Sequence, residues 1–85
     1  MIMNKVLVKL YVPILELQFD VWLPISRNVS KVIILLVKAI NEFSGGIYNP
    51  KTMPTLYDKS TAKAYNINSS VKDNNIKNGT EIVLI

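Results

Sequence analysis

The stretch that decides the fold is residues 29–43, which read VSKVIILLVKAINEF. At 100° per residue, the spacing of an α-helix, most of its apolar side chains fall within one arc and its charged side chains fall opposite. The stretch therefore predicts an amphipathic helix that packs against a second layer. The apolar arc comprises Val29, Val32, Ile33, Leu36, Val37, Ile40 and Phe43, and the polar arc comprises Lys31, Lys38 and Glu42.

The residues that flank this stretch carry signals for the two ends of a helix. Asn28 precedes it, and an asparagine side-chain oxygen can accept a hydrogen bond from the free amides of a first helical turn. Gly45, with Gly46 behind it, follows the stretch and can adopt the left-handed conformation that closes a helix. We therefore expect the helix to begin at Val29 and to stop before Gly45.

Two aliphatic residues of the stretch, Ile34 and Leu35, fall on the flanks of the polar arc. One interpretation is that the core contact is broad and these residues merely fill it. The other is that they form a second contact surface for a partner. The sequence leaves both interpretations open.

Two runs with a period of two residues precede the predicted helix, and this alternation is typical of half-buried strands. They are residues 5–12 and 16–23, and the connection between them contains Pro13. They predict an antiparallel hairpin, which Pro24 ends because proline has no amide hydrogen for the ladder. The face expected to be buried carries Val6, Val8, Leu10, Val12, Leu17, Phe19, Val21 and Leu23.

The sequence after the predicted helix changes to a loop and short strands. Residues 47–54 hold two prolines and an asparagine and predict a connecting loop. Residues 55–58 and 64–67 predict two short strands joined by a polar turn over residues 59–61.

The last part of the chain predicts a helical turn followed by a strand. Ser70 and Asp73 have the spacing of a weak capping box, which starts a single helical turn. Asn78-Gly79 then supplies a tight turn into a last strand over residues 80–85. The residues expected to point inward are Val71, Ile76, Ile82 and Leu84.

Length and composition limit the kinds of protein that this chain can be. Its 85 residues predict one domain over residues 1–85, since a chain of 9.6 kDa cannot build two cores. With 49% hydrophobic and 19% charged residues, it should fold. The absence of Cys and His excludes a thiol nucleophile, a histidine base and a Cys/His zinc site. We expect no catalytic, cofactor-binding or metal-binding residues, and no enzyme activity.

The formal net charge of +4 is spread evenly along the chain. Residues 1–50 and residues 51–85 each hold five basic and three acidic groups, so each part carries +2. The basic groups are lysines apart from Arg27, whereas nucleic-acid binders gather arginines on one face. We therefore expect no nucleic-acid partner. A small regulatory or nucleic-acid-associated protein that uses scattered lysines remains the alternative.

Neither apolar stretch of the chain has the pattern of an export or membrane segment. Lys9 interrupts the apolar run of residues 1–12, and no small-residue cleavage site follows. Charged residues limit the apolar part of residues 29–43 to far fewer than the roughly 20 residues that a spanning helix needs. The sequence is therefore interpreted as that of a cytoplasmic protein without membrane insertion.

The order of the predicted elements points to one fold class. A hairpin, a helix across its face and a final strand that returns to the sheet are the order of an α+β, β-grasp (ubiquitin-like) fold. We expect a mixed four- or five-stranded sheet with one amphipathic helix packed on one face. Residues 71–84, VKDNNIKNGTEIVL, resemble the usual ending of ubiquitin-like domains.

Three short motifs carry a narrower resemblance. They are Leu23-Pro24 before the aliphatic helix, Leu56-Tyr57-Asp58, and the final pattern Ile76-x-Asn78-Gly79-Thr80-x-Ile82-x-Leu84-Ile85. With these motifs the chain resembles the YukD/EsaB family of small bacterial ubiquitin-like proteins associated with type VII secretion. The resemblance implies a non-enzymatic accessory or adaptor protein of a type VII (WXG100/ESX-like) system, which contacts a secretion-system component.

Conjugation of the ubiquitin type needs a flexible tail that ends in Gly-Gly. This sequence ends at Ile85, inside the predicted last strand, and Gly45-Gly46 is internal. We therefore expect neither conjugation nor a sulfur-carrier role.

The outer face of the predicted sheet supplies the candidate site. If the first strand lies between the second and the last, Leu7 and Tyr11 stand beside Trp22 on one side and beside Val83 and Ile85 on the other. Aromatic and aliphatic side chains grouped on a rigid sheet are typical of a protein-binding hot spot. Long Lys and Gln side chains could instead shield them, and a homodimer through the same patch is a further alternative. The candidate interaction residues are Leu7, Tyr11, Trp22, Val83, Ile34 and Leu35.

Overall fold

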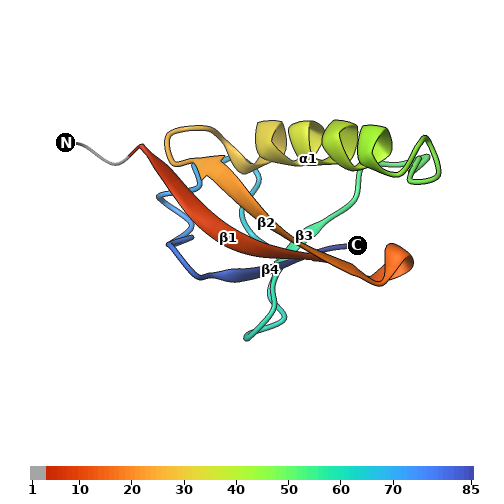
Figure 1. The fold of residues 1–85 in the computed structure, drawn as a ribbon. Helices are drawn as coiled ribbons and strands as arrows, with labels where there is room; N and C mark the ends of the chain where they lie inside the picture. Colours follow the sequence, from red (N-terminus) through yellow and green to blue (C-terminus); the bar gives the residue numbers. More distant parts are fainter. Residues whose placement is uncertain (1–3) are drawn as a thin grey trace.

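The computed structural model describes residues 4–85; residues 1–3, which begin the apolar N-terminal run, lie outside the described residues. Within them the chain forms a sheet with one α-helix across one face of it (Figure 1). The elements are β1 (Lys5–Val12), the 3-10 helix η1 (Pro13–Leu15), β2 (Leu17–Pro24), α1 (Val29–Phe43), β3 (Leu56–Asp58) and β4 (Glu81–Leu84).

The sheet is mixed, with the strand order β2-β1-β4-β3. β1 pairs antiparallel with β2 and parallel with β4, and β3 pairs antiparallel with β4. The first strand therefore lies between the second and the last, as the sequence analysis assumed. The α+β arrangement of the predicted β-grasp fold is confirmed, with four strands in the sheet of residues 4–85.

The hairpin turn differs from the prediction by one residue. Pro13–Leu15 form the 3-10 turn, and the amide of Glu16 donates to the carbonyl of Pro13 at 2.9 Å. Glu16, which was expected to begin the second strand, takes a left-handed conformation with φ 53° and belongs to the turn. Pro24 closes β2 opposite Lys5, at the end of an edge strand where proline is tolerated.

Helix α1 begins and ends at the predicted residues, but its first turn is not capped by the predicted group. Asn28 makes no side-chain capping bond. The amides of Val29 and Ser30 instead donate to the carbonyls of Ser69 and Ile67, both at 3.0 Å. Because a later loop already satisfies these amides, the side-chain cap is not needed.

The predicted apolar arc of α1 is buried except near its C-terminal end. Val29, Val32, Ile33, Leu36 and Ile40 are buried, and Val37 is half-buried. Phe43 was predicted to lie in the core and is 69% exposed, so that prediction is wrong. Its ring packs edge-on against Phe19 of β2, with the centroids 5.1 Å apart. β2 is an edge strand, and in residues 4–85 no further strand extends the sheet beneath this ring.

The two strands of the hairpin contribute unequally to the core. The inward residues Val8, Leu10 and Val12 of the central strand β1 are buried. On the edge strand β2 only Leu23 is buried; Phe19 and Val21 are half-buried, and Leu17 is exposed. The core is completed by Tyr48, from the loop after α1, together with Leu56, Val71, Ile76, Ile82 and Leu84.

The strand predicted over residues 64–67 does not form, and that prediction is wrong. A single bridge joins Tyr57 to Ala64. The amide of Asn66, which would have extended a ladder, donates to the side chain of Asn74 at 2.9 Å. That side chain also donates to the carbonyls of Asn66 and Ser70. A side-chain network therefore replaces strand pairing in this segment.

The predicted turn at Asn78-Gly79 joins the last strand to β1. Gly79 has φ 85°, a conformation that suits glycine. The side-chain oxygen of Asn78 accepts from the amide of Leu7 at 2.7 Å, and the amide of Gly79 donates to the carbonyl of Leu7 at 2.8 Å. The strand that follows, β4, covers four of the six predicted residues.

Two neighbouring isoleucines of α1 test the assigned helix face. Ile33 is 1% exposed and Ile34 is 48% exposed. Ile33→Ala should lower the free energy of unfolding by about 2–5 kcal/mol, because it leaves a cavity in the core. Ile34→Ala should lower it by less than about 1 kcal/mol. Urea denaturation of both variants measures the difference, and equal losses would contradict the assigned face.

Candidate functional site: the outer face of the sheet

Strand register brings the outward side chains of the sheet into three rows. Because side chains alternate along a strand, the odd-numbered residues of β1 point away from α1, and their partners on β2 and β4 share that face. The rows are Trp22–Leu7; Asp20–Lys9–Glu81; and Gln18–Tyr11–Val83–Tyr57.

The first row is an aromatic–aliphatic pair. Leu7 lies directly opposite Trp22 across the β1–β2 hairpin. Leu7 is half-buried, whereas Trp22 is 56% exposed. With Asp20 and the Asn78-Gly79 turn, this pair lines a shallow hollow of about 360 Å³. The hollow offers an apolar wall beside polar groups, which is the composition of a protein-binding surface.

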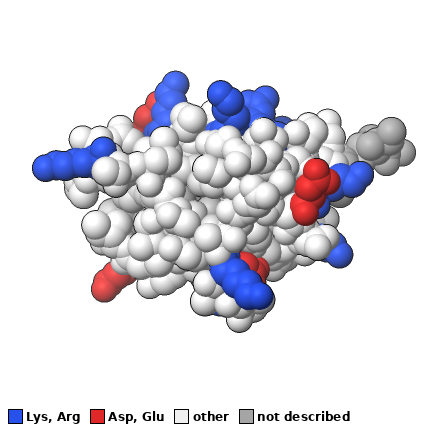
Figure 2. Space-filling view, turned by 180° about the vertical axis from the view of Figure 1, so that it is seen from behind, with Lys and Arg blue, Asp and Glu red and all other residues white. Residues whose placement is uncertain are grey.

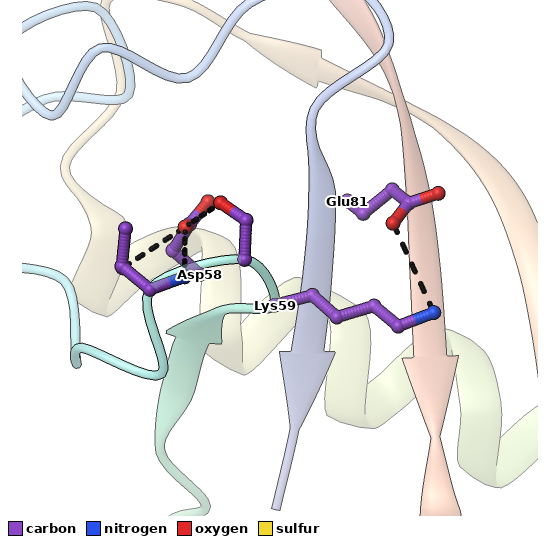
Figure 3. A network of polar contacts seen from close by, with 5 residues as sticks. Asp58, Lys59 and Glu81 are labelled. Carbon is purple, nitrogen blue, oxygen red and sulfur yellow. Dashed lines mark hydrogen bonds and ion pairs between the residues drawn. The ribbon is translucent and has the colours of Figure 1, made fainter.

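The second row is charged and alternates in sign across the sheet. Asp20 lies opposite Lys9, and Lys9 lies opposite Glu81. Glu81 pairs with Lys59, whose Nζ is 3.8 Å from Oε2, as Figure 3 shows. Both side chains are half exposed, so this ion pair contributes little to stability. The row separates the apolar side chains on its two sides.

The third row places Tyr11, Val83 and Tyr57 side by side on three neighbouring strands. All three are half-buried, and the exposed Gln18 lies opposite Tyr11 on β2. Ile85, two residues after Val83, is exposed, and its backbone exchanges two hydrogen bonds with Thr55. The row contains an aromatic residue that the sequence analysis did not select. The alternation of side chains along a strand could have placed Tyr57 on the outer face, because its neighbour Leu56 is buried on the inner face.

The structure thus brings the sheet-face candidates together as two pairs. Leu7 lies opposite Trp22, and Tyr11 lies opposite Val83. The charged row lies between the pairs, so the four residues do not form one uninterrupted apolar patch. Lys9 lies between the two pairs on the same face, because it is two residues from both Leu7 and Tyr11.

The two candidates on the helix lie on the other side of the molecule. Ile34 and Leu35 are both about half exposed on α1, which covers the opposite face of the sheet (Figure 1). At 100° per residue they point to opposite flanks of the helix. Leu35 shares its flank with Ala39 and Phe43, which line an apolar groove beside β2, and Ile34 points away from that groove. The helix candidates therefore form neither one surface nor part of the sheet face.

A further exposed apolar surface, at the hairpin end of the molecule, was missed in the sequence. Ile14, Ile47 and Met53 are all strongly exposed. Ile14 and Met53 line a hollow of about 380 Å³ together with Tyr48 and Ile85. These residues come from a turn and a loop without periodicity, so no pattern in the sequence indicated that they would meet.

The carboxylate of Asp58 holds the turn after β3. Its Oδ2 accepts hydrogen bonds from the hydroxyl of Ser60 at 2.7 Å and from the amide and hydroxyl of Thr61, both at 2.9 Å (Figure 3). The hydroxyl of Tyr65 donates to Oδ1 at 3.0 Å. The hydrogen bonds from Ser60 and then Thr61 lower the pKa of Asp58 to about 2, and burial together with Asp58 raises the pKa of Tyr65.

This network stabilises a turn and offers no acid–base chemistry near neutral pH. A carboxylate with a pKa of about 2 is too weak a base to accept protons there.

In residues 4–85, no three acidic side chains gather closely enough to hold a metal ion. The helix of the same residues lacks the length and apolar character needed to cross a bilayer. The described surface has shallow hollows, exposed apolar side chains and scattered charges, which are features that can contact another molecule.

Charged side chains surround an uncharged centre on the face that Figure 2 shows. Lysine and arginine lie at several points around its margin, with acidic side chains among them. On the outer sheet face the charged row alternates in sign. Neither arrangement is the basic stripe that phosphate backbones require.

Comparison with known proteins identifies the fold. The chain matches the EccD5 ubiquitin-like domain from Mycobacterium xenopi with a TM-score of 0.79 and 18% identity, covering 98% of this chain and 94% of that domain. It matches the ubiquitin-like domain of the Mycobacterium tuberculosis type VII secretion protein ECCD1 with a TM-score of 0.78 and 13% identity, covering 98% and 99%. The chain has a ubiquitin-like fold.

A third match is a chain within a larger assembly. The MycP5-free ESX-5 inner membrane complex contains a chain that matches with a TM-score of 0.80 and 18% identity. This match covers 98% of the present chain and 21% of that one. No protein-family model and no curated protein matches the sequence. At these identities the ubiquitin-like architecture is shared although most side chains differ.

The lowered pKa of Asp58 predicts a pH-dependent contribution to stability. Because the folded carboxylate has a lower pKa than an unfolded one, it stabilises the fold above about pH 4, the unfolded value. That contribution is lost as the pH falls towards the folded pKa of about 2. Asp58→Ala should therefore lower the free energy of unfolding at pH 7, and its difference from the unsubstituted protein should shrink below about pH 4.

Urea denaturation across this pH range measures that difference. Asp73→Ala, which removes an exposed turn carboxylate outside the network, is the matched control and should show a smaller effect at pH 7. A difference for Asp58→Ala that stays constant down to low pH would contradict the stabilising role of the hydrogen-bonded carboxylate.

Proposed function

We propose that this chain is a non-enzymatic ubiquitin-like accessory protein of a type VII secretion system. It acts as one domain over residues 1–85, in the cytoplasm, by noncovalent contact with a component of the secretion machinery. Its full-length structural similarity to the ubiquitin-like domains of EccD proteins carries the proposal. The YukD/EsaB-like motifs in the sequence support it independently.

The structural similarity is informative because it involves the whole chain. The matches to the two EccD domains cover nearly all of both partners, with TM-scores of 0.79 and 0.78. A designed protein based on ubiquitin, in contrast, matches with a TM-score of 0.67. Within the ubiquitin-like architecture, the present chain is therefore more similar in shape to these secretion-system domains than to that design.

The outer face of the sheet is the surface through which we propose this contact is made. Trp22 is exposed on a strand that a full antiparallel register holds in place, so its backbone needs no further ordering on binding. Leu7 beside it widens the apolar contact, and exposed tryptophan is a frequent centre of binding energy. The charged row of Asp20, Lys9 and Glu81 beside this pair provides a polar rim that orients a partner. Tyr11 and Val83 extend the contact on the far side of this rim.

Charge substitution at the centre of this face tests the proposal. Trp22→Glu should reduce recovery of secretion-system proteins by about tenfold or more, because it places a carboxylate in a desolvated contact. The measurement is affinity purification of the tagged protein from its source cells, with quantitative mass spectrometry of type VII components. Ile34→Glu, on the opposite side of the molecule, is the matched control and should retain them.

Two outcomes of the same purification would overturn parts of this proposal. Retained recovery with Trp22→Glu and lost recovery with Ile34→Glu would move the contact from the sheet face to the helix. An absence of every secretion component, together with salt-dependent binding of the purified protein to nucleic acid, would favour the alternative role. Intact-mass measurement of the recovered protein tests the noncovalent mode, since a covalent adduct would contradict it.

A further inference from the structure

The hydrogen bonds of β1 determine which backbone groups of β2 remain free. The amide and carbonyl of Leu7 bond to Asn78 and Gly79, and the amide of Lys9 bonds to the carbonyl of Thr80 at 3.0 Å. The odd-numbered residues of β1 therefore direct their backbone groups towards β4. Because these directions alternate along a strand, the even-numbered residues of β1 bond to β2.

The free edge of β2 follows from this alternation. Phe19 and Val21 lie opposite Leu10 and Val8, so their backbone groups face β1. The N–H and C=O groups of Gln18, Asp20 and Trp22 point the other way, and no strand of residues 4–85 pairs with that edge. Five consecutive residues thus present three pairs of donors and acceptors to an incoming strand.

An apolar groove runs beside this edge, on the helix side of the sheet. Phe19 and Val21 form its floor at the sheet, and Ala39 and Phe43 form its wall on α1. The groove has a volume of about 190 Å³, and the edge-on contact between Phe19 and Phe43 closes one part of it. Its lining contains no charged or polar side chain: Leu10, Phe19, Val21, Leu36, Ala39, Ile40 and Phe43.

The charge of the edge is negative. β2 contains no Lys or Arg, and its acidic residue is Asp20, in the middle of the free positions. Asp20 is exposed and forms no ion pair within residues 4–85, where the salt bridge joins Lys59 to Glu81. A strand added here would place one set of alternate side chains in the groove and the other set beside Asp20.

We propose that the β2 edge and the adjoining groove bind an extended peptide segment of another protein as an additional strand. Its alternate apolar side chains, opposite Phe19 and Val21, enter the groove, and a basic side chain lies opposite Asp20. Main-chain hydrogen bonds with Gln18, Asp20 and Trp22 supply the pairing, and the groove and the carboxylate supply the selectivity. The groove lies on the helix side of the sheet, whereas the carboxylate of Asp20 belongs to the charged row of the outer face, so this surface adjoins that face at the β2 edge.

A second copy of this chain fits the edge less well than such a peptide. The two-fold pairing of β2 with β2 that uses all three free positions places Gln18 opposite Trp22 and Asp20 opposite Asp20. Two carboxylates directly opposite one another are unfavourable. A basic residue at that position removes the repulsion and adds an attraction.

The probe is the synthetic peptide acetyl-Lys-Val-Lys-Val-Lys-Val-Lys-amide, added to the ¹⁵N-labelled protein. Saturable shifts of the Gln18, Asp20 and Trp22 amides are expected, and hydrogen exchange of these three should slow by about tenfold or more on binding. Exchange of Phe19 and Val21, whose amides already face β1, should stay unchanged. A peptide of the same composition with its lysines and valines in separate blocks is the control and should bind more weakly by about tenfold or more.

Paired variants of α1 separate the groove from a general charge effect. Ala39→Arg fills the groove from an exposed helix position, and Ile34→Arg adds the same charge on the opposite flank. Ala39→Arg should weaken binding by about tenfold or more, whereas Ile34→Arg should stay within about twofold. Equal effects of the two variants, equal binding of the two peptides, shifts confined to the outer face, or slowed exchange at the edge caused by self-association would each overturn the proposal.

Discussion

The structure depends on the burial of one helical arc against the inner face of the central strand. Val8, Leu10 and Val12 of β1 are almost fully buried, and α1 covers them with five buried aliphatic side chains. At 85 residues, with no disulfide and no metal cluster in the described part of the chain, apolar burial supplies most of the stability. The two proposed binding surfaces are held in place by this contact: the outer sheet face is its reverse side, and the groove is its margin.

The C-terminal strand reaches the centre of the sheet through a short clamp. Asn78 and Gly79 satisfy both backbone groups of Leu7, so the parallel β1–β4 pairing begins at a fixed position. This register decides which side chains share a row on the outer face. It places Lys9 opposite Glu81 and Tyr11 opposite Val83, and therefore sets the charged row between the two apolar pairs.

Local pattern predicted most of the fold, and long-range contacts account for the differences. The bounds of α1 and the hairpin follow from strong periodicity and from proline. The segment after β3 was misassigned because Asn66 pairs with Asn74, eight residues away, which a strand pattern does not reveal. The cap of α1 comes from the carbonyls of Ile67 and Ser69 rather than from Asn28, for the same reason. Alternation predicted which candidate side chains share the outer face of the sheet. It did not predict which of them stand in the same row, because the rows depend on the register between strands.

The position of β2 at the edge of the sheet explains why some residues predicted to lie in the core are only partly buried. It also explains why both faces of this strand are available for binding. A strand with one neighbour leaves its inward side chains partly uncovered, which is why Phe19 and Val21 are half-buried although they lie on the inward face of the hairpin. The same lack of a neighbour leaves Phe43 exposed at the end of α1. Because β2 also carries Trp22 on its other face, one strand supplies the most exposed aromatic side chain of the outer face and the floor of the groove. Its two faces can therefore be occupied separately, since alternation directs neighbouring side chains to opposite sides.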